Sequence, residues 1–210
     1  MKFLPSIRSA IVRHLPPTVR TTIRRRINQT RWLEAQVRKI LPAWAGGRIP
    51  ASTLTARVLH PEDAEALARL NGTPQDPEHI QAYRANLARG DRFYIGIFAE
   101  GRLIARAWCG EVIASLGLPG QWACGDFVRP DLRYRGVGQL LHRERLAEAR
   151  RRGITTVFIF VSEINYPNLG ACQAAGFVRL QAPDWSTIIE EKMRRAGHTP
   201  PRQVVLVHGG

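Results

Sequence analysis

The hydrophobic positions of residues 51–210 follow two different periods, which predict strands and helices. Apolar runs bounded by turn residues predict strands. Phe93–Phe98 and Leu103–Trp108 are joined by Glu100-Gly101, which predicts a hairpin. The β-branched run Ile154–Val161 has no charged position and is typical of a central strand buried on both faces. The predicted strands are 54–58, 93–98, 103–108, 122–128, 154–161, 177–180 and 204–207.

Helices are predicted where apolar residues recur every three or four positions. Pro61, followed by acidic residues, opens the first helix. A second runs from about Asp76 to Leu87, a third from about Val137 to Arg152, and a short one from Asn168 to Ala175. The order of strand, two helices, three antiparallel strands, helix, strand, helix and strand predicts a mixed α/β fold, with a mostly antiparallel sheet flanked by helices.

The first 50 residues differ from the rest in charge. They hold 11 Lys and Arg and one acidic residue, whereas residues 51–210 hold 20 basic and 16 acidic residues; the whole chain has a net charge of +14. A loop signal over 45–50 marks the boundary between a basic extension, 1–50, and a domain, 51–210. Apolar residues spaced near three and four between the arginines predict that the extension is an amphipathic helix: Ile23, Ile27, Val37, Ile40 and Leu41.

Three interpretations of this extension stay open. Its apolar stripe and arginines suit peripheral binding to an anionic membrane surface through residues 1–44. Its charge alone also suits nucleic acid. As a third alternative, it is a helical hairpin packed on the domain with its arginines in solvent.

Cysteine usage and hydropathy bound the class of protein. Three cysteines without CxxC spacing predict reduced thiols in the cytoplasm, with no disulfide framework and no metal site; the inner face of the membrane is the alternative location. No run approaches the roughly 20 apolar residues of a membrane-spanning helix. Arg8, Arg13 and His14 interrupt any signal peptide. A homodimer stays open.

The most informative stretch is Phe127–Leu141, a strand that ends at Pro130, then a glycine turn and a helix start. Unpaired N–H groups and the positive dipole end of such a helix attract a diphosphate, and Arg133 and Arg135 add charge beside it. A P-loop is excluded because no Gly-Lys-Ser/Thr follows, and Leu141 takes the place of the third glycine of a dinucleotide fingerprint. An ordinary left-handed glycine turn explains these residues equally well.

A family resemblance makes this stretch specific. Arg133–Gly138, with the V-x-P strand end at Val128 and Pro130, resembles the R/Q-x-x-G-x-G/A motif of the GNAT N-acetyltransferase superfamily. Further along, Asn165–Phe177 resembles a second motif of that family, an Asn-led short helix that ends in Gly-Phe. The resemblance covers roughly residues 52–182. It implies a GNAT-like sheet in which the fourth and fifth strands splay apart.

The resemblance also implies acetyl-CoA, or a related acyl-CoA, as co-substrate. In the family, backbone amides of the loop after the fourth strand bind the CoA pyrophosphate, and pantetheine runs between the splayed strands. Polar side chains of the second motif contact CoA. The matching residues here are Phe127, Val128, Arg133, Arg135, Gly136, Val137, Gly138, Gln139, Asn165 and Asn168.

The implied reaction is direct attack of an amine on the thioester, which needs a base for the ammonium and an acid for the leaving thiolate. Asp126 is the first candidate base, and alternation places it on one strand face with Trp122 and Val128. Alternatively, Asp126 only stabilises the splay through hydrogen bonds. Glu111 is the second candidate, with a solvated strand acid as its alternative.

Cys172 stands where many members of the family have a tyrosine as the acid. A thiol with an ordinary pKa of about 8.5 could protonate the thiolate; otherwise Cys172 is a small buried residue. A covalent acyl-cysteine would need a base beside it, and the sequence places neither His142 nor His198 there.

The sequence therefore predicts an acyl-CoA-dependent acyltransferase that acts on an amine of an unidentified acceptor. Two other classes stay open: a non-catalytic CoA-binding module of the same fold, and an adaptor that works through its basic extension. Loops near 71–80, 114–120 and 183–201 are predicted to select the acceptor.

Overall fold

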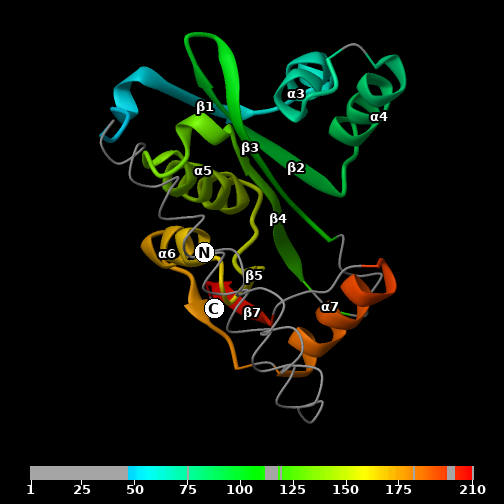
Figure 1. Cartoon of the computed structure of the whole chain (residues 1–210), viewed down its shortest axis with the longest axis vertical. Coiled ribbons are helices and arrows are strands. Elements are labelled where there is room, and N and C mark those ends of the chain that lie inside the picture. The colour runs from blue at the N-terminus through cyan, green and yellow to red at the C-terminus, as the bar shows by residue number, and fades with distance from the viewer. Residues whose placement is uncertain are drawn as a thin grey trace, which may run out of the picture. The chain divides into compact units, whose positions relative to one another are not determined.

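The computed structural model describes residues 47–74, 76–111, 118, 120–181, 183–197 and 202–209 (Figure 1). All of them belong to one compact unit of the chain, residues 42–210. The predicted helical extension, apart from residues 47–50, lies outside these ranges. No helix within the described ranges has the length and apolar character that a membrane span needs.

Seven strands form one sheet in the order β1-β2-β3-β4-β5-β7-β6. Neighbouring strands are antiparallel except for β4 and β5, which run parallel. The mixed α/β fold with a mostly antiparallel sheet is therefore confirmed. The strands are β1 (Leu54–Val58), β2 (Arg92–Ala99), β3 (Arg102–Gly110), β4 (Gln121–Val128), β5 (Val157–Ser162), β6 (Val178–Arg179) and β7 (Gln203–His208).

Helices cover both faces of this sheet (Figure 1). α5 packs across β2 and β3, and α6 packs beside α5. α3, α4 and α7 contribute to separate apolar clusters. Trp108 of β3 is the cross-strand neighbour of both Tyr94 and Cys124, so these clusters share the face opposite α5. The helices are α3 (Ala64–Asn71), α4 (Pro77–Leu87), α5 (Val137–Arg151), α6 (Tyr166–Ala174) and α7 (Pro183–Arg195).

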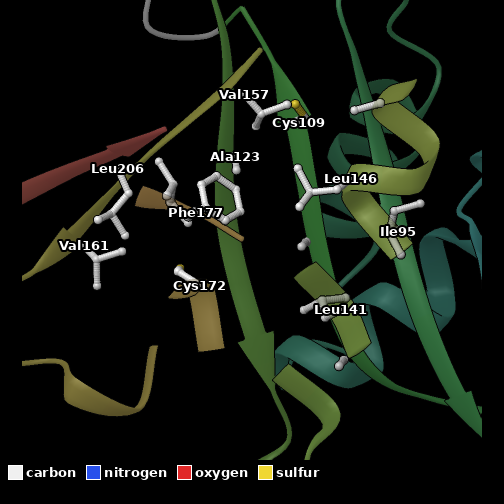
Figure 2. Close-up of a cluster of buried hydrophobic side chains, with 14 of the residues drawn as sticks. Ile95, Cys109, Ala123, Leu141, Leu146, Val157, Val161, Cys172, Phe177 and Leu206 are labelled. Carbon is white, nitrogen blue, oxygen red and sulfur yellow. The ribbon is translucent and has the colours of Figure 1, made fainter. Parts of the chain in front are cut away.

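The main core lies between the sheet and the helices α5 and α6. Figure 2 shows Leu141 and Leu146 of α5 beside the strand that carries Ile95. Cys172 and Phe177 extend the same cluster toward β5 and β7. Truncation of a leucine in such a core typically costs about 2–5 kcal/mol of stability, so this cluster fixes α5 on the sheet.

β5 is covered on both faces, as its sequence predicts. Val157 and Ile159 enter the main core. Phe158 and Phe160 alternate with them and pack against Trp122 on the other face. Because neither face of this strand meets solvent freely, it has no polar alternation.

One helix is absent from the prediction. The sequence predicts a variable loop over 183–201, whereas Pro183–Arg195 forms α7 between β6 and β7. Ile189 is buried, and Trp185 and Met193 pack in the same cluster at spacings of four residues. This periodicity is helical, so the loop prediction was wrong for the part that α7 occupies. The chain then returns so that β7 inserts between β5 and β6.

β4 and β5 separate soon after they meet. They pair only at Gln121 with Val157 and at Trp122 with Phe158, whereas β4 stays paired with β3 as far as Val128. Among the described residues, the second half of β4 therefore has no strand on its β5 side. This confirms the splayed pair that the resemblance implies.

A β-bulge lies in this unpaired half of β4. Gly125 and Asp126 stand opposite the single residue Ala107 of β3, and Gly125 has a φ of +64°. The extra residue breaks the alternation, because Trp122 faces the α7 side but Asp126 contacts α5. The prediction that Trp122 and Asp126 share a face is therefore wrong. The position of the bulge depends on the pairing register between β3 and β4, so it could not be predicted from β4 alone.

Gly125→Ala should lower the free energy of unfolding by about 1–3 kcal/mol. A Cβ there would need a left-handed backbone and would stand 2.5 Å from Cδ1 of the Trp108 indole ring. Denaturant titration measures the change. Gly90→Ala is the control, because Gly90 has open space around it and the expected change is below about 0.5 kcal/mol. Equal stability of the two variants would show that the bulge tolerates a side chain.

Candidate active site

The turn before α5 presents backbone amides at a helix start. Gly136, the residue before α5, has a φ of +88° and gives the helix no side-chain cap, so the first N–H groups of α5 lack intrahelical partners. Val137 is buried in the main core and fixes the first turn. Gly138 faces open space, since a Cβ there would meet no described atom within 4 Å. Free amides beside open space suit a phosphate group.

The end of β4 leads into this turn. Phe127 pairs with β3, and the N–H of Arg129 donates to Ile104 of β3 at 2.9 Å. Because neighbouring residues of a strand direct their backbone groups to opposite sides, Val128 presents its groups to the gap. Its carbonyl accepts from Nε of Arg133 at 3.0 Å. Of the two residues predicted to line pantetheine, Val128 faces the gap and Phe127 bonds toward β3.

Arg135 of the motif and Gln139 of α5 bind a segment that precedes β1. Nε of Arg135 donates to the carbonyl of Gly47 at 3.1 Å. In return, the N–H of Ile49 donates to the carbonyl of Arg135 at 3.2 Å. Oε1 of Gln139, in the first turn of α5, accepts from Nη2 of Arg48. This segment therefore lies along the turn.

The two asparagines of the second motif have different surroundings. The side chain of Asn165 accepts from the N–H of Asn168 at 3.4 Å and caps α6. Asn168 instead turns toward α5, where its Oδ1 lies 3.0 Å from Nε2 of His142. The structure thus gives Asn165 a capping role and joins Asn168 to a buried polar cluster.

Four side chains from β4, α5 and α6, here termed the polar ring, form a hydrogen-bonded cluster. Nη1 of Arg145 donates to Oδ1 of Asp126, and its Nη2 donates to Nδ1 of His142 at 2.6 Å. His142 therefore carries its proton on Nε2 and donates it to Oδ1 of Asn168. Oδ2 of Asp126 also lies 3.8 Å from Nε2 of His142, so the four side chains form one contiguous cluster.

Burial and mutual contact fix the charges of the polar ring. Arg145 is fully buried, and the side chain of Asp126 is 18% exposed. Burial alone would raise the pKa of Asp126, but the charge of Arg145, its hydrogen bond and the neighbouring His142 and Asn168 together outweigh burial and hold that pKa below its ordinary value. Burial lowers the pKa of His142. At neutral pH, Asp126 is therefore a carboxylate and His142 is neutral.

Cys172 lies against the polar ring, with Sγ 3.6 Å from Nε2 of His142. The sequence did not place a histidine there, and this contact corrects that expectation. It does not make a nucleophile, because Cys172 is fully buried and burial raises the pKa of its thiol to about 12. Both imidazole nitrogens are also engaged, with Arg145 and with Asn168. The surroundings favour the small buried residue.

The structure does not bring Glu111 to Asp126. The exposed side chain of Glu111 accepts from Gln121 at 3.0 Å, where β4 begins. Asp126 lies further along the strand, roughly 15 Å away at the rise of an extended chain. These surroundings are those of a solvated strand acid. Nor do the described residues gather three or more His, Cys, Asp or Glu side chains that could hold a metal ion.

Arg145 and His142 were not among the predicted site residues. Both lie on the face of α5 that carries Leu141 and Ala149 into the core. An arginine at a core-facing helical position is a signal of a buried partner. The partner could not be identified from the sequence, because Asp126 reaches this face only through the bulge.

Comparisons with known proteins agree with the motifs. A profile of the acetyltransferase (GNAT) family matches residues 61–177. Mycothiol acetyltransferase of Saccharomonospora viridis is 26% identical over 148 residues, which cover 64% of this chain and 48% of that protein. The chain therefore spans about half the length of this curated relative.

Solved acetyltransferases share the fold. A ribosomal L7/L12 α-N-protein acetyltransferase in complex with coenzyme A has a TM-score of 0.56 at 15% identity, over 77% of this chain and 97% of that chain. A ribosomal-protein-alanine N-acetyltransferase from Brucella melitensis has a TM-score of 0.56 at 16% identity, over 74% of this chain and 99% of that chain. At these identities the likeness concerns the fold alone.

Arg145→Met should lower the free energy of unfolding at pH 7 by about 3–5 kcal/mol, because it leaves the carboxylate of Asp126 without its buried partner. An ordinary aspartate has a pKa of about 3.9. The pKa of Asp126 in the folded protein lies below that value. The stability from this pair is therefore present above about pH 4 and is lost as pH falls through the folded pKa. Denaturant titrations between about pH 3 and 7 measure this dependence.

Arg143→Met is the matched control, since Arg143 is exposed on the same helix. Its expected change is below about 0.5 kcal/mol. A loss in Arg145→Met that is equally large at both ends of the pH range would contradict the ion pair and point to packing alone.

Proposed function

Because the chain belongs to the acetyltransferase (GNAT) family, we propose that it transfers an acetyl group from acetyl-CoA to an amine of its acceptor. The turn before α5 is the observation that supports this proposal most directly. Its free amides follow the unpaired half of β4 along the chain. A diphosphate at those amides would leave the rest of a CoA molecule to run along the open edge of β4.

The residues of this part of the chain divide the work of binding CoA. The amides of Arg135–Gly138 hold the diphosphate, and Val137 keeps them in place through its buried side chain. Val128 offers its backbone to pantetheine. Arg133 holds the carbonyl of Val128 and adds a positive charge beside the phosphates.

Asp126 is proposed to hold the acceptor amine for direct attack. In that step the amine nitrogen bonds to the thioester carbonyl carbon, the C–S bond breaks, the amine loses a proton and the thiolate gains one. Asp126 lies on the unpaired half of β4, and Arg145 occupies one of its oxygens. Its lowered pKa makes it a weak base. It is therefore better suited to bind an ammonium or orient a water molecule than to remove the proton itself.

Burial of both Cys172 and His142 disfavours a route through an acyl-cysteine. Activation of Cys172 needs a thiolate and an imidazolium. Burial raises the pKa of Cys172 to about 12 and lowers the pKa of His142. Both shifts oppose the ion pair, so direct attack is the simpler chemistry for this site.

Saturation with acetyl-CoA should stabilise the protein against heat. At about 100 times the dissociation constant, the gain is about 2.7 kcal/mol, or roughly 5–10 °C in Tm. Gly138→Trp should abolish the shift, because it fills the space over the turn. Gly90→Trp, in open space away from the turn, should keep the shift. A full shift in Gly138→Trp would exclude this turn as the cofactor site.

Asp126→Asn should reduce acetyl transfer by about 10²-fold or more while acetyl-CoA still binds. Thiol release measures transfer, with small amines and a peptide N-terminus as acceptors, since the names of the related proteins include both mycothiol and ribosomal proteins. Glu111→Gln is the comparison and should retain transfer. If Asp126→Asn is less stable but transfers acetyl groups at the full rate, Asp126 has a purely structural role. If neither the wild-type protein nor the two variants transfer acetyl groups, a CoA-binding module is favoured.

A further inference from the structure

The segment of residues 47–49 lies along the turn before α5 but outside the part of the chain that the family profile matches. Two hydrogen bonds with Arg135 hold it there, one from the N–H of Ile49 and one to the carbonyl of Gly47. Ile49 is also half-buried against the main core. Both neighbours of Arg48 are therefore anchored, and the position of Arg48 beside the turn is fixed by the backbone.

The guanidinium of Arg48 reaches over the start of α5. Its Nη2 donates to Oε1 of Gln139, and its Nε lies 3.5 Å from the point that a Cβ of Gly136 would occupy. The side chain is exposed. A guanidinium has five N–H donors, so the bond to Gln139 leaves several of them for another acceptor.

No carboxylate among the described residues neutralises this cation. Asp131, the acid closest to the turn in the sequence, is already paired with Arg129 at 2.7 Å. Arg133 is directed to the carbonyl of Val128. A fixed cation with spare donors beside free helix amides matches the charge and geometry of a phosphate group.

We propose that Arg48 is a further CoA-binding residue, which donates to the diphosphate of the cofactor at the turn before α5. This inference rests on the proposed function, because it assigns a residue to the same cofactor site. The alternative is that Arg48 only ties its segment to Gln139. In that case the residue contributes to folding and not to the affinity for phosphate groups.

Calorimetric titration of the full chain with CoA and with 3′-dephospho-CoA tests the proposal. Arg48→Ala should weaken the binding of both ligands by about tenfold, as expected for one lost charge-assisted hydrogen bond. Arg48→Gln, which keeps a polar side chain, should show a similar loss and serves if the alanine variant folds poorly. Arg179→Ala is the charge-matched control, since Arg179 is exposed on β6, and its affinity should not change.

Three outcomes would overturn the assignment of Arg48, and a fourth would overturn the proposed function. If both Arg48 variants bind the two ligands as tightly as the wild type but have a lower Tm without ligand, Arg48 has only a structural role. A loss for CoA but not for 3′-dephospho-CoA would move the contact from the diphosphate to the 3′-phosphate. An equal loss in Arg179→Ala would reflect net charge. Failure of the wild-type protein to bind either ligand would refute the proposed function itself, which separates that failure from a failure of the Arg48 assignment.

Discussion

A buried guanidinium that needs a carboxylate is the constraint on which the site depends. Arg145 is fully buried in the main core, and its charge there would be costly without a partner. Asp126 supplies that partner only because the bulge at Gly125 turns it to the face of α5. The pair joins β4 to α5 on the half of the strand that β5 has left. The bulge, the splay and the polar ring are therefore parts of one arrangement.

This arrangement separates positive and negative charge along a short stretch of chain. Asp126 is held as a carboxylate on the unpaired half of β4. A few residues later, the start of α5 presents free amides, and Arg48 of the segment before β1 reaches this helix start through Gln139. A cofactor with phosphate groups and an acceptor with an ammonium group would be oriented by these two oppositely charged regions. Within the polar ring, Arg145 bonds to Asp126 and His142, and His142 bonds to Asn168, so these side chains hold one another in place beside the unpaired half of β4.

Local sequence was sufficient to predict the parts of the fold that are decided locally. The glycine turn, the start of α5 and the two-sided burial of β5 follow from turn residues and periodicity within a few positions. The face of Asp126 could not be predicted, because a bulge depends on the register between β3 and β4. The polar ring combines residues of three elements, and His142 and Asn168 are 26 positions apart. α7 was missed although Trp185, Ile189 and Met193 repeat every four residues, since the resemblance ended before it.

Cys172 and His142 show why distance alone does not identify a catalytic pair. Their side chains are 3.6 Å apart, a separation that would suit proton transfer in an exposed site. Burial disfavours the charged forms of both groups, so the thiolate–imidazolium pair is opposed from both sides. The lone pair of Nδ1 is occupied by Arg145. The same environment that keeps Asp126 ionised through Arg145 therefore keeps the thiol inert, and this division supports the direct attack proposed for the acceptor over a route through Cys172.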